Sequence, residues 1–124
     1  MNDLEVVAKE IVDSAFKIHK SFGPGLLEKI YESCLEHELK KRGLKVERQL
    51  IIPVEYDGLI LNEGFRLDLL VENQIIIELK AIETHNKLWE AQIISYLKLL
   101  QMPLGFLINF NTPLIKNGIK RFKN

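Results

Sequence analysis

Apolar residues near both ends of the chain recur every three or four positions, and this period predicts helices. Residues 4–22 place one apolar stripe on such a helix: Leu4, Val7, Ile11, Ala15, Ile18 and Phe22. The run 23-GPG-25 ends it, and a second helix is predicted from about residue 26 to residue 42, with Gly43 as its C-terminal cap. The apolar side of this second helix is predicted to hold Leu27, Ile30, Tyr31, Cys34, Leu35 and Leu39. The helical period returns from about residue 86 to residue 101.

Between the second and third helices the pattern changes to β-branched and alternating residues, which predicts strands. The expected strands are 45–58, ending in an Asp-Gly turn, then 59–62 and 65–71 around a turn at Asn62–Gly64, then 75–82. Pro53 indicates an edge strand or a bulge. After the third helix, 104–110 is expected to be a buried strand and 118–124 a final strand or tail. The order α–α–β–β–β–β–α–β predicts an α/β (α+β) domain over residues 1–124, with a central mixed sheet covered by helices on both faces.

Composition narrows the class of protein. The chain has 124 residues, 47% hydrophobic and 27% charged, which is the balance of a soluble globular domain with a real core. The 17 basic and 17 acidic residues cancel, so bulk charge alone would not hold this protein on nucleic acid. The single cysteine, Cys34, excludes an internal disulfide and a cysteine-based zinc site, and we expect it to be a buried thiol. No leader-like or membrane-spanning run is visible, so the expected location is the cytoplasm.

The stretch 65-FRLDLLVENQIIIELKAIE-83 places charged residues inside a predicted buried hairpin. If residues 72–74 form the loop, Asp68 faces Glu78 and Arg66 faces Lys80, and these four side chains share one face of the sheet. The other face would then hold Phe65, Leu67, Leu69, Ile77 and Leu79. Two carboxylates opposite each other destabilise a sheet and need compensation. The residues alone allow either an ion-pair network with Arg66 and Lys80 or a divalent cation.

Polar residues on two of the predicted helices could belong to the same site. Glu28 falls inside the apolar arc of the second helix, on the side of Tyr31, and Glu38 falls in the same arc nearer the helix end. Gln92 and Tyr96 are one turn apart on the third helix. These side chains either line a functional site or lie at the boundary of the core.

The motifs together resemble a known family. Asp68 followed by 78-ELK-80 resembles the D…(D/E)xK signature of the PD-(D/E)xK nuclease superfamily, and 25-GLLEKIY-31 resembles the motif of its GxxExxY branch. The likeness continues in order through 66-RLDLLVE-72, 91-AQIISYLK-98, 105-GFLINF-110 and 118-GIKR-121, nearly the whole chain. This resemblance implies a restriction-endonuclease-like fold and a metal-dependent nuclease, acting most often on DNA.

The resemblance also implies roles for individual residues. Asp68 and Glu78 would be metal ligands for Mg²⁺ or Mn²⁺, with the Leu79 backbone carbonyl contributing and Glu28 acting through water. Lys80 would be the catalytic lysine, and Gln92 and Tyr96 match a QxxxY pattern of related nucleases. The chain departs from the family at Trp89, where many members carry a histidine, and His85 is expected to be a surface residue near the start of the helix.

The basic residues bear on whether the protein can bind nucleic acid. Two clusters are either solvated surface or, if they flank the site, a grip on phosphates: Lys116, Lys120, Arg121 and Lys123, and Lys40, Lys41, Arg42, Lys45 and Arg48. A nuclease of this size would need a homodimer or a partner protein to cut both strands, and no membrane partner is expected. Two alternatives stay open: a non-catalytic nucleic-acid- or protein-binding module on the same fold, and a globular domain whose acids are neutralised by Arg66 and Lys80.

Overall fold

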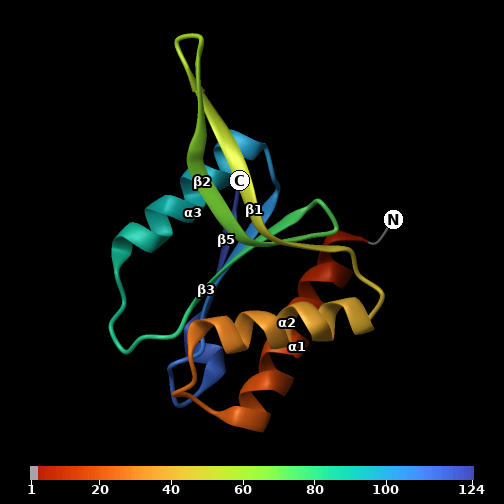
Figure 1. Ribbon diagram of the computed structural model, residues 1–124. Helices are drawn as coiled ribbons and strands as arrows, with labels where there is room; N and C mark the ends of the chain where they lie inside the picture. The colour runs from red at the N-terminus through yellow and green to blue at the C-terminus, as the bar shows by residue number, and fades with distance from the viewer. Residues whose placement is uncertain (1–2) are drawn as a thin grey trace.

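The computed structural model describes residues 3–124, with Glu63 described by its backbone (Figure 1). In chain order the elements are α1 (Leu4–Phe22), α2 (Glu28–Lys41), β1 (Val46–Tyr56), β2 (Leu59–Val71), β3 (Ile75–Lys80), α3 (Lys87–Leu100), β4 (Leu104–Asn109), the short 3-10 helix η1 (Ile115–Gly118) and β5 (Ile119–Lys123). The three predicted helices are confirmed to within two residues at each end. The last segment is a strand, not a tail. Within residues 3–124 no helix is long and apolar enough to cross a membrane.

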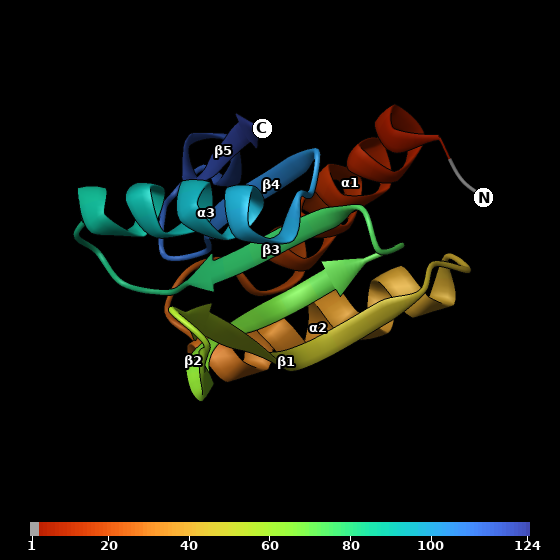
Figure 2. The same cartoon turned by 90° about the horizontal axis from the view of Figure 1, so that it is seen from above.

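The strands form one five-stranded sheet in the order β1-β2-β3-β4-β5. Neighbouring strands are antiparallel except β3 and β4, which are parallel and are joined through α3. A parallel pair needs such a crossover, because the chain must return to the same end of the sheet. Helices α1 and α2 lie on one face of the sheet and α3 lies on the other (Figure 2). The predicted mixed sheet with helices on both faces is confirmed.

The helix ends are set by local hydrogen bonds. The Asp3 carboxylate accepts a bond from the Glu5 amide at 2.9 Å, and the Asn86 side chain accepts one from the Leu88 amide at 2.9 Å. Each satisfies an amide that a first helical turn leaves unpaired. Gly43 follows α2 with φ of 85°, the left-handed conformation predicted for the glycine after a helix.

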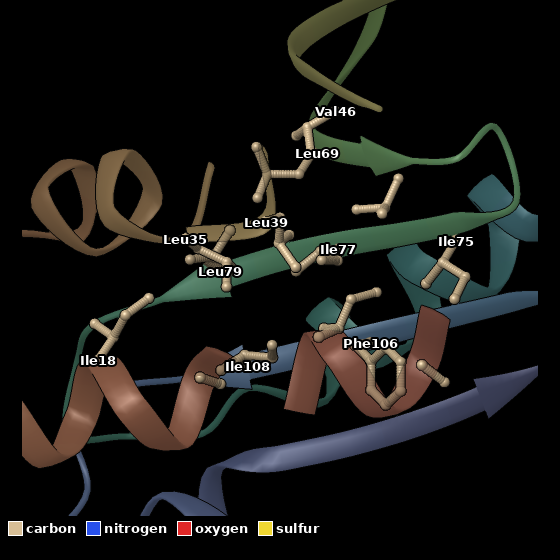
Figure 3. Packing of buried hydrophobic residues seen from close by; sticks show 14 of the residues in the cluster. Ile18, Leu35, Leu39, Val46, Leu69, Ile75, Ile77, Leu79, Phe106 and Ile108 are labelled. Carbon is tan, nitrogen blue, oxygen red and sulfur yellow. The ribbon is translucent and has the colours of Figure 1, made fainter. Parts of the chain in front are cut away.

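Two apolar clusters hold the helices against the sheet. The larger lies under α1 and α2 and contains Ile11, Leu35 and Phe106, and part of it is shown in Figure 3. The smaller lies under α3 and contains Leu70, Ile76 and Ile93. Three residues expected in the core are exposed instead: Phe22 (52%), Leu27 (75%) and Ile30 (44%). Leu27 is the N-cap residue of α2 and makes no side-chain capping hydrogen bond. Cys34, expected to be buried, is only half-buried.

The strands expected at 59–62 and 65–71 are one strand, so three strands, not four, precede α3. The predicted turn at Asn62–Gly64 is wrong. A Cβ atom on Gly64 would lie 2.5 Å from the Val54 side chain, so this glycine allows a close approach between β1 and β2. The approach occurs where the register shifts between Ile52 and Val54, which confirms the bulge predicted at Pro53 on an edge strand. The Asp57–Gly58 turn is confirmed, with φ of 50° and 81°.

The register predicted for the β2–β3 hairpin is confirmed at Leu69–Ile77, Leu70–Ile76 and Val71–Ile75. The predicted division into two faces is wrong for part of β2. Leu69, Ile77 and Leu79 pack under α1 and α2, but Leu67 and Phe65 pack with α3. The strict alternation fails beside Asp68, where β1 carries Gln49 with a left-handed φ of 53°. Arg66 therefore lies against Gln49, with 3.3 Å between its Nη1 and the Gln49 Oε1, and does not pair with Lys80.

Candidate active site

The paired part of β2 and β3 ends at Leu69 and Ile77, and beyond this point the strands separate (Figure 2). Asp68 lies at the start of the separation. Its Oδ2 accepts a hydrogen bond from the Leu79 amide at 2.8 Å. The Asp68 carboxylate thus takes the place that a backbone carbonyl of β2 would hold if the β2–β3 ladder continued. The result is a gap in the sheet with a carboxylate inside it.

Glu78 contributes a second carboxyl group to this gap. It is 7% exposed, and its Oε1 atom has no hydrogen-bond partner. Burial raises the pKa of Glu78 to about 10, and the neighbouring Asp68 adds to the rise through its charge and a hydrogen bond between the two groups. Lys80 acts in the opposite direction. An unpartnered oxygen in such a place is a reason to look for a missing cation or ligand.

Glu28 is the first residue of α2 and lines one hollow with Gln49, whose amide nitrogen lies 3.4 Å from Asp68 Oδ1 at the gap. Loss of hydration raises its pKa, the Asp68 carboxylate raises it further, and the Lys80 ammonium lowers it. Both residues therefore lie near enough to Glu28 for their charges to act on it. The Glu32 carboxylate, one turn further along α2, also raises the pKa of Glu28.

Tyr31 fixes the turn that leads into Glu28. Its ring stacks on Phe110 with centroids 4.5 Å apart, and its hydroxyl donates to the Gly23 carbonyl at 2.6 Å and accepts from the Leu26 amide at 3.1 Å. The contacts of the tyrosine in the 25-GLLEKIY-31 motif are therefore those of a structural residue. It holds the start of α2 in place and, with it, the acid three residues earlier.

Lys80 lies at the end of β3, with its Nζ atom 5.0 Å from the centre of the Trp89 ring. Attraction between an ammonium and the face of an indole holds the lysine in place without neutralising it. No acidic side chain that the structure describes forms an ion pair with Lys80. His85 contacts the edge of the same ring and pairs with Glu90, at the exposed start of α3 as predicted.

Gln92 and Tyr96 approach the gap from α3. Tyr96 is 7% exposed and stacks on Phe65 with centroids 4.2 Å apart. Burial and the nearby charges of Glu78 and Asp68 raise the pKa of the Tyr96 hydroxyl, and a hydrogen bond with Gln92 lowers it. All six side chains proposed from the sequence thus lie around one gap: Glu28, Asp68, Glu78, Lys80, Gln92 and Tyr96.

A family model described as the PD-(D/E)XK nuclease superfamily matches residues 5–122, across all the elements that build this gap. The chain belongs to the PD-(D/E)XK nuclease superfamily. No curated protein and no solved structure gives a significant match. Nucleases of the PD-(D/E)XK superfamily generally use divalent metal ions, and membership supports a nuclease-like function with nucleic acid as the partner for this chain. Its narrower assignment to the GxxExxY branch stays a prediction.

The donor set of this PD-(D/E)XK chain fits a divalent ion in part. Among the side chains that the structure describes, no three of Asp, Glu, His or Cys gather closely enough to hold a metal by themselves. Asp68 and Glu78 do lie together, and the unpartnered Glu78 oxygen is the hard ligand that such an ion prefers. A site with two direct carboxylates leaves its other positions to backbone oxygen and water, as is common for Mg²⁺.

Sequence reasoning missed a polar network behind Asp68. The Gln49 amide nitrogen lies 2.7 Å from the Glu32 carboxylate and 3.4 Å from Asp68 Oδ1. Glu32, only 3% exposed, also accepts a 2.8 Å bond from Arg48. Glu32 could have been found, because it lies one turn after Glu28 on the same stripe. Gln49 has no such signal, since its contact depends on its left-handed backbone.

The other acid and the basic clusters have ordinary partners. Glu38 pairs with Lys17 at 3.2 Å and with Arg42 at 3.0 Å, which accounts for a carboxylate in the apolar arc. Five residues of the two basic clusters are bound to acids within 3.2 Å: Lys40, Arg42, Arg48, Lys120 and Arg121. Arg121 pairs with Glu5 and Lys45 with Glu47. Most of these charges are therefore compensated within the protein.

Proposed function

We propose that this protein is a metal-dependent nuclease that hydrolyses phosphodiester bonds in DNA. The observation that carries the proposal is the buried Glu78 carboxyl group, which meets Asp68 in the gap between β2 and β3 and leaves one oxygen without a partner. A fold that needed only stability would not keep two adjacent carboxyl groups there, because their mutual repulsion and burial cost free energy. A bound cation would reverse that cost.

Asp68 and Glu78 are the residues that would hold the ion, with Glu28 contributing through water. The Leu79 carbonyl is a candidate fourth donor. Its amide points toward Asp68, and the N–H and C=O of one strand residue point to the same side, so the carbonyl also faces the gap. A divalent ion bound there would supply positive charge to the scissile phosphate and lower the pKa of water.

Lys80 is the residue we assign to charge stabilisation. Its ammonium is held over Trp89 and has no ion pair with an acid in the described part of the chain, so it can donate to a phosphate oxygen or orient the attacking water. Glu28 would hold water on the side of the gap opposite α3. Both roles use a side chain, Lys80 or Glu28, that lies beside the gap between β2 and β3.

Gln92 and Tyr96 are assigned to positioning. Gln92 acts on the Tyr96 hydroxyl, which lies beside the two acids, and Gln92 is exposed, so its amide can contact the DNA backbone. Further cations lie beside site residues along the chain: Lys29 follows Glu28 on α2, and Lys87 begins α3 two residues before Trp89. Neither forms an ion pair with an acidic side chain that the structure describes. These would attract the phosphate backbone.

The test compares cleavage of single-stranded, duplex and branched DNA and of RNA, with Mg²⁺ or Mn²⁺ and with EDTA. Asp68→Asn and Lys80→Ala should each lower the cleavage rate by at least about 100-fold. Asp13→Asn and Lys20→Ala are matched controls, because both residues are exposed and lie on α1, which contributes no side chain to the gap. Circular dichroism verifies that every variant is folded.

Three outcomes separate the alternatives. Cleavage that needs metal and is lost in both site variants supports the nuclease. Binding of nucleic acid without cleavage would identify a non-catalytic module on the same fold, and absence of both would leave a globular domain with no such role. Size-exclusion chromatography with light scattering, on the same samples, tests whether cutting both strands of a duplex requires a homodimer.

A further inference from the structure

A pocket of about 410 Å³ lies beside the candidate active site, between the start of α3, the end of β4 and η1. We call it the Trp89 pocket, because Trp89 forms one wall. Leu107 contributes a buried apolar surface, and Asn111 and Asn117 contribute side-chain amides. Its size is in the range of pockets that hold small organic groups.

The side-chain amides of Asn111 and Asn117 in the Trp89 pocket are available to form hydrogen bonds with a ligand. Asn109 is occupied: its nitrogen donates to the Ile82 carbonyl at 2.8 Å and its oxygen accepts from the Asn111 amide at 3.0 Å. By contrast, no hydrogen bond joins the side-chain amide of Asn111 or Asn117 to any group that the structure describes. Each presents both a donor and an acceptor, as the edge of a nucleobase does.

The charges of the Trp89 pocket disfavour a phosphate as its occupant. Lys120 reaches the pocket but is bound to Glu90 at 2.9 Å, and Glu90 also pairs with His85. Glu83 adds an exposed carboxylate. A wall with compensated cations and a free acid repels an anion. An aromatic side chain with free amides suits a neutral heteroaromatic ring, which can stack and be hydrogen-bonded at its edge.

Trp89 also connects the Trp89 pocket to the active site. The same residue lines a second hollow, on the side of Lys80 and Gln92, and its ring lies 5.0 Å from the Lys80 ammonium. A nucleotide whose phosphate is bound at Lys80 would therefore have Trp89 as its neighbour. Bases stacked within a duplex cannot enter such a pocket, whereas unpaired bases can.

We infer that the Trp89 pocket holds one unstacked nucleobase next to the cleaved phosphate, and that the enzyme acts on unpaired nucleic acid. This inference rests on the proposed nuclease function for the position of that phosphate. The pocket itself is a binding site and can be tested without cleavage.

Trp89 is the single tryptophan of the chain, so its fluorescence reports on the pocket directly. The protein is titrated in EDTA with single-stranded oligothymidylate and with a duplex of the same length, both as the wild type and as Glu78→Gln, whose site has one carboxyl group fewer. Single strands should quench the fluorescence and the duplex should not. Trp89→Leu should bind a labelled single strand about tenfold more weakly, and Trp89→Phe should retain most of the affinity.

A second variant avoids any effect on Lys80. Asn117→Ala should change the preference among the four homopolymeric single strands, and Asn62→Ala, an exposed asparagine on the far hairpin, should not. Equal quenching by duplex and single strand, wild-type affinity in Trp89→Leu, or no binding of nucleic acid by folded protein would each overturn the inference. Quenching without cleavage in Mg²⁺ would instead refute the nuclease and leave the base pocket standing.

Discussion

Glu78 is a carboxyl group in a place where a carboxylate is unstable. It is nearly buried, it adjoins Asp68, and its pKa is raised to about 10. At neutral pH the metal-free folded protein therefore holds a proton that the unfolded chain releases. The proton occupies the place that a cation would take, and metal affinity should rise as the proton is removed.

The pH dependence of stability follows from this proton. Because the folded pKa of Glu78 lies above its ordinary value of 4.5, the contribution of this group to stability is complete below about pH 4.5 and falls as the pH rises toward 10. We expect the unfolding free energy of the metal-free wild type to fall between pH 5 and pH 9 more steeply than that of Glu78→Gln, measured by urea denaturation in EDTA. Asp13→Asn is the control and should keep the wild-type slope. Equal slopes for wild type and Glu78→Gln would contradict the raised pKa.

At the scale of elements, α2 matters because its first residue is an acid of the site. The turn before it includes Gly25 at φ of 107° and is tied to the helix by the Tyr31 hydroxyl. The position of Glu28 thus depends on a side chain that itself stays away from the gap. The interaction between Tyr31 and Phe110 extends this dependence to the end of β4.

Tyr31→Phe should lower the unfolding free energy by about 1–3 kcal/mol, because it leaves the partly buried Leu26 amide and Gly23 carbonyl without their shared partner. The measurement is urea denaturation at neutral pH. Tyr56→Phe is a matched control, since Tyr56 is 74% exposed on the β1–β2 hairpin, and it should change stability very little. A loss of the same size in both variants would contradict a specific role of the Tyr31 hydroxyl.

The elements also show what the sequence could and could not predict. Helices were predictable because their signals are local: apolar spacing, the Asn86 cap and the glycine after α2. The motif acids could be placed at one site because the loop length determines the register of the β2–β3 hairpin. The continuous strand β2 could not be predicted, because Gly64 serves a contact with Val54 on another strand. Gln49 was missed for the same reason, since its role depends on how α2 packs against the sheet.

At the scale of the whole molecule, the structure divides into a well-supported centre and a projecting arm. β3 lies between β2 and β4 and is covered by helices on both faces, whereas the tip of the β1–β2 hairpin extends away from the helices (Figure 1). Residues before Leu69 on β2 are paired with β1 alone. Local stability should differ accordingly.

Hydrogen–deuterium exchange should therefore show slow amides in β3 and β4 and fast amides at the hairpin tip, around residues 54–61. The tip also carries exposed apolar side chains, Leu59 and Ile60 among them. If these amides were as protected as those of β3, and became less protected on dilution, the hairpin would be the contact between copies of the chain. Fast exchange at every protein concentration would exclude the hairpin from any dimer.

The hydrogen bond from the Leu79 amide to Asp68 has a consequence for evolution and for mutagenesis alike. Asp68 keeps the two strands apart as well as supplying an acid, because it accepts a hydrogen bond from the Leu79 amide, which would otherwise pair with the backbone of β2. Asparagine keeps an acceptor oxygen and should preserve the opening while removing the charge. Alanine has neither the oxygen nor the charge, so the Leu79 amide would be free to pair with the backbone of β2, and the gap between β2 and β3 would close. A descendant of this chain that abandoned catalysis could thus lose the charge at this position at little structural cost, but not the oxygen.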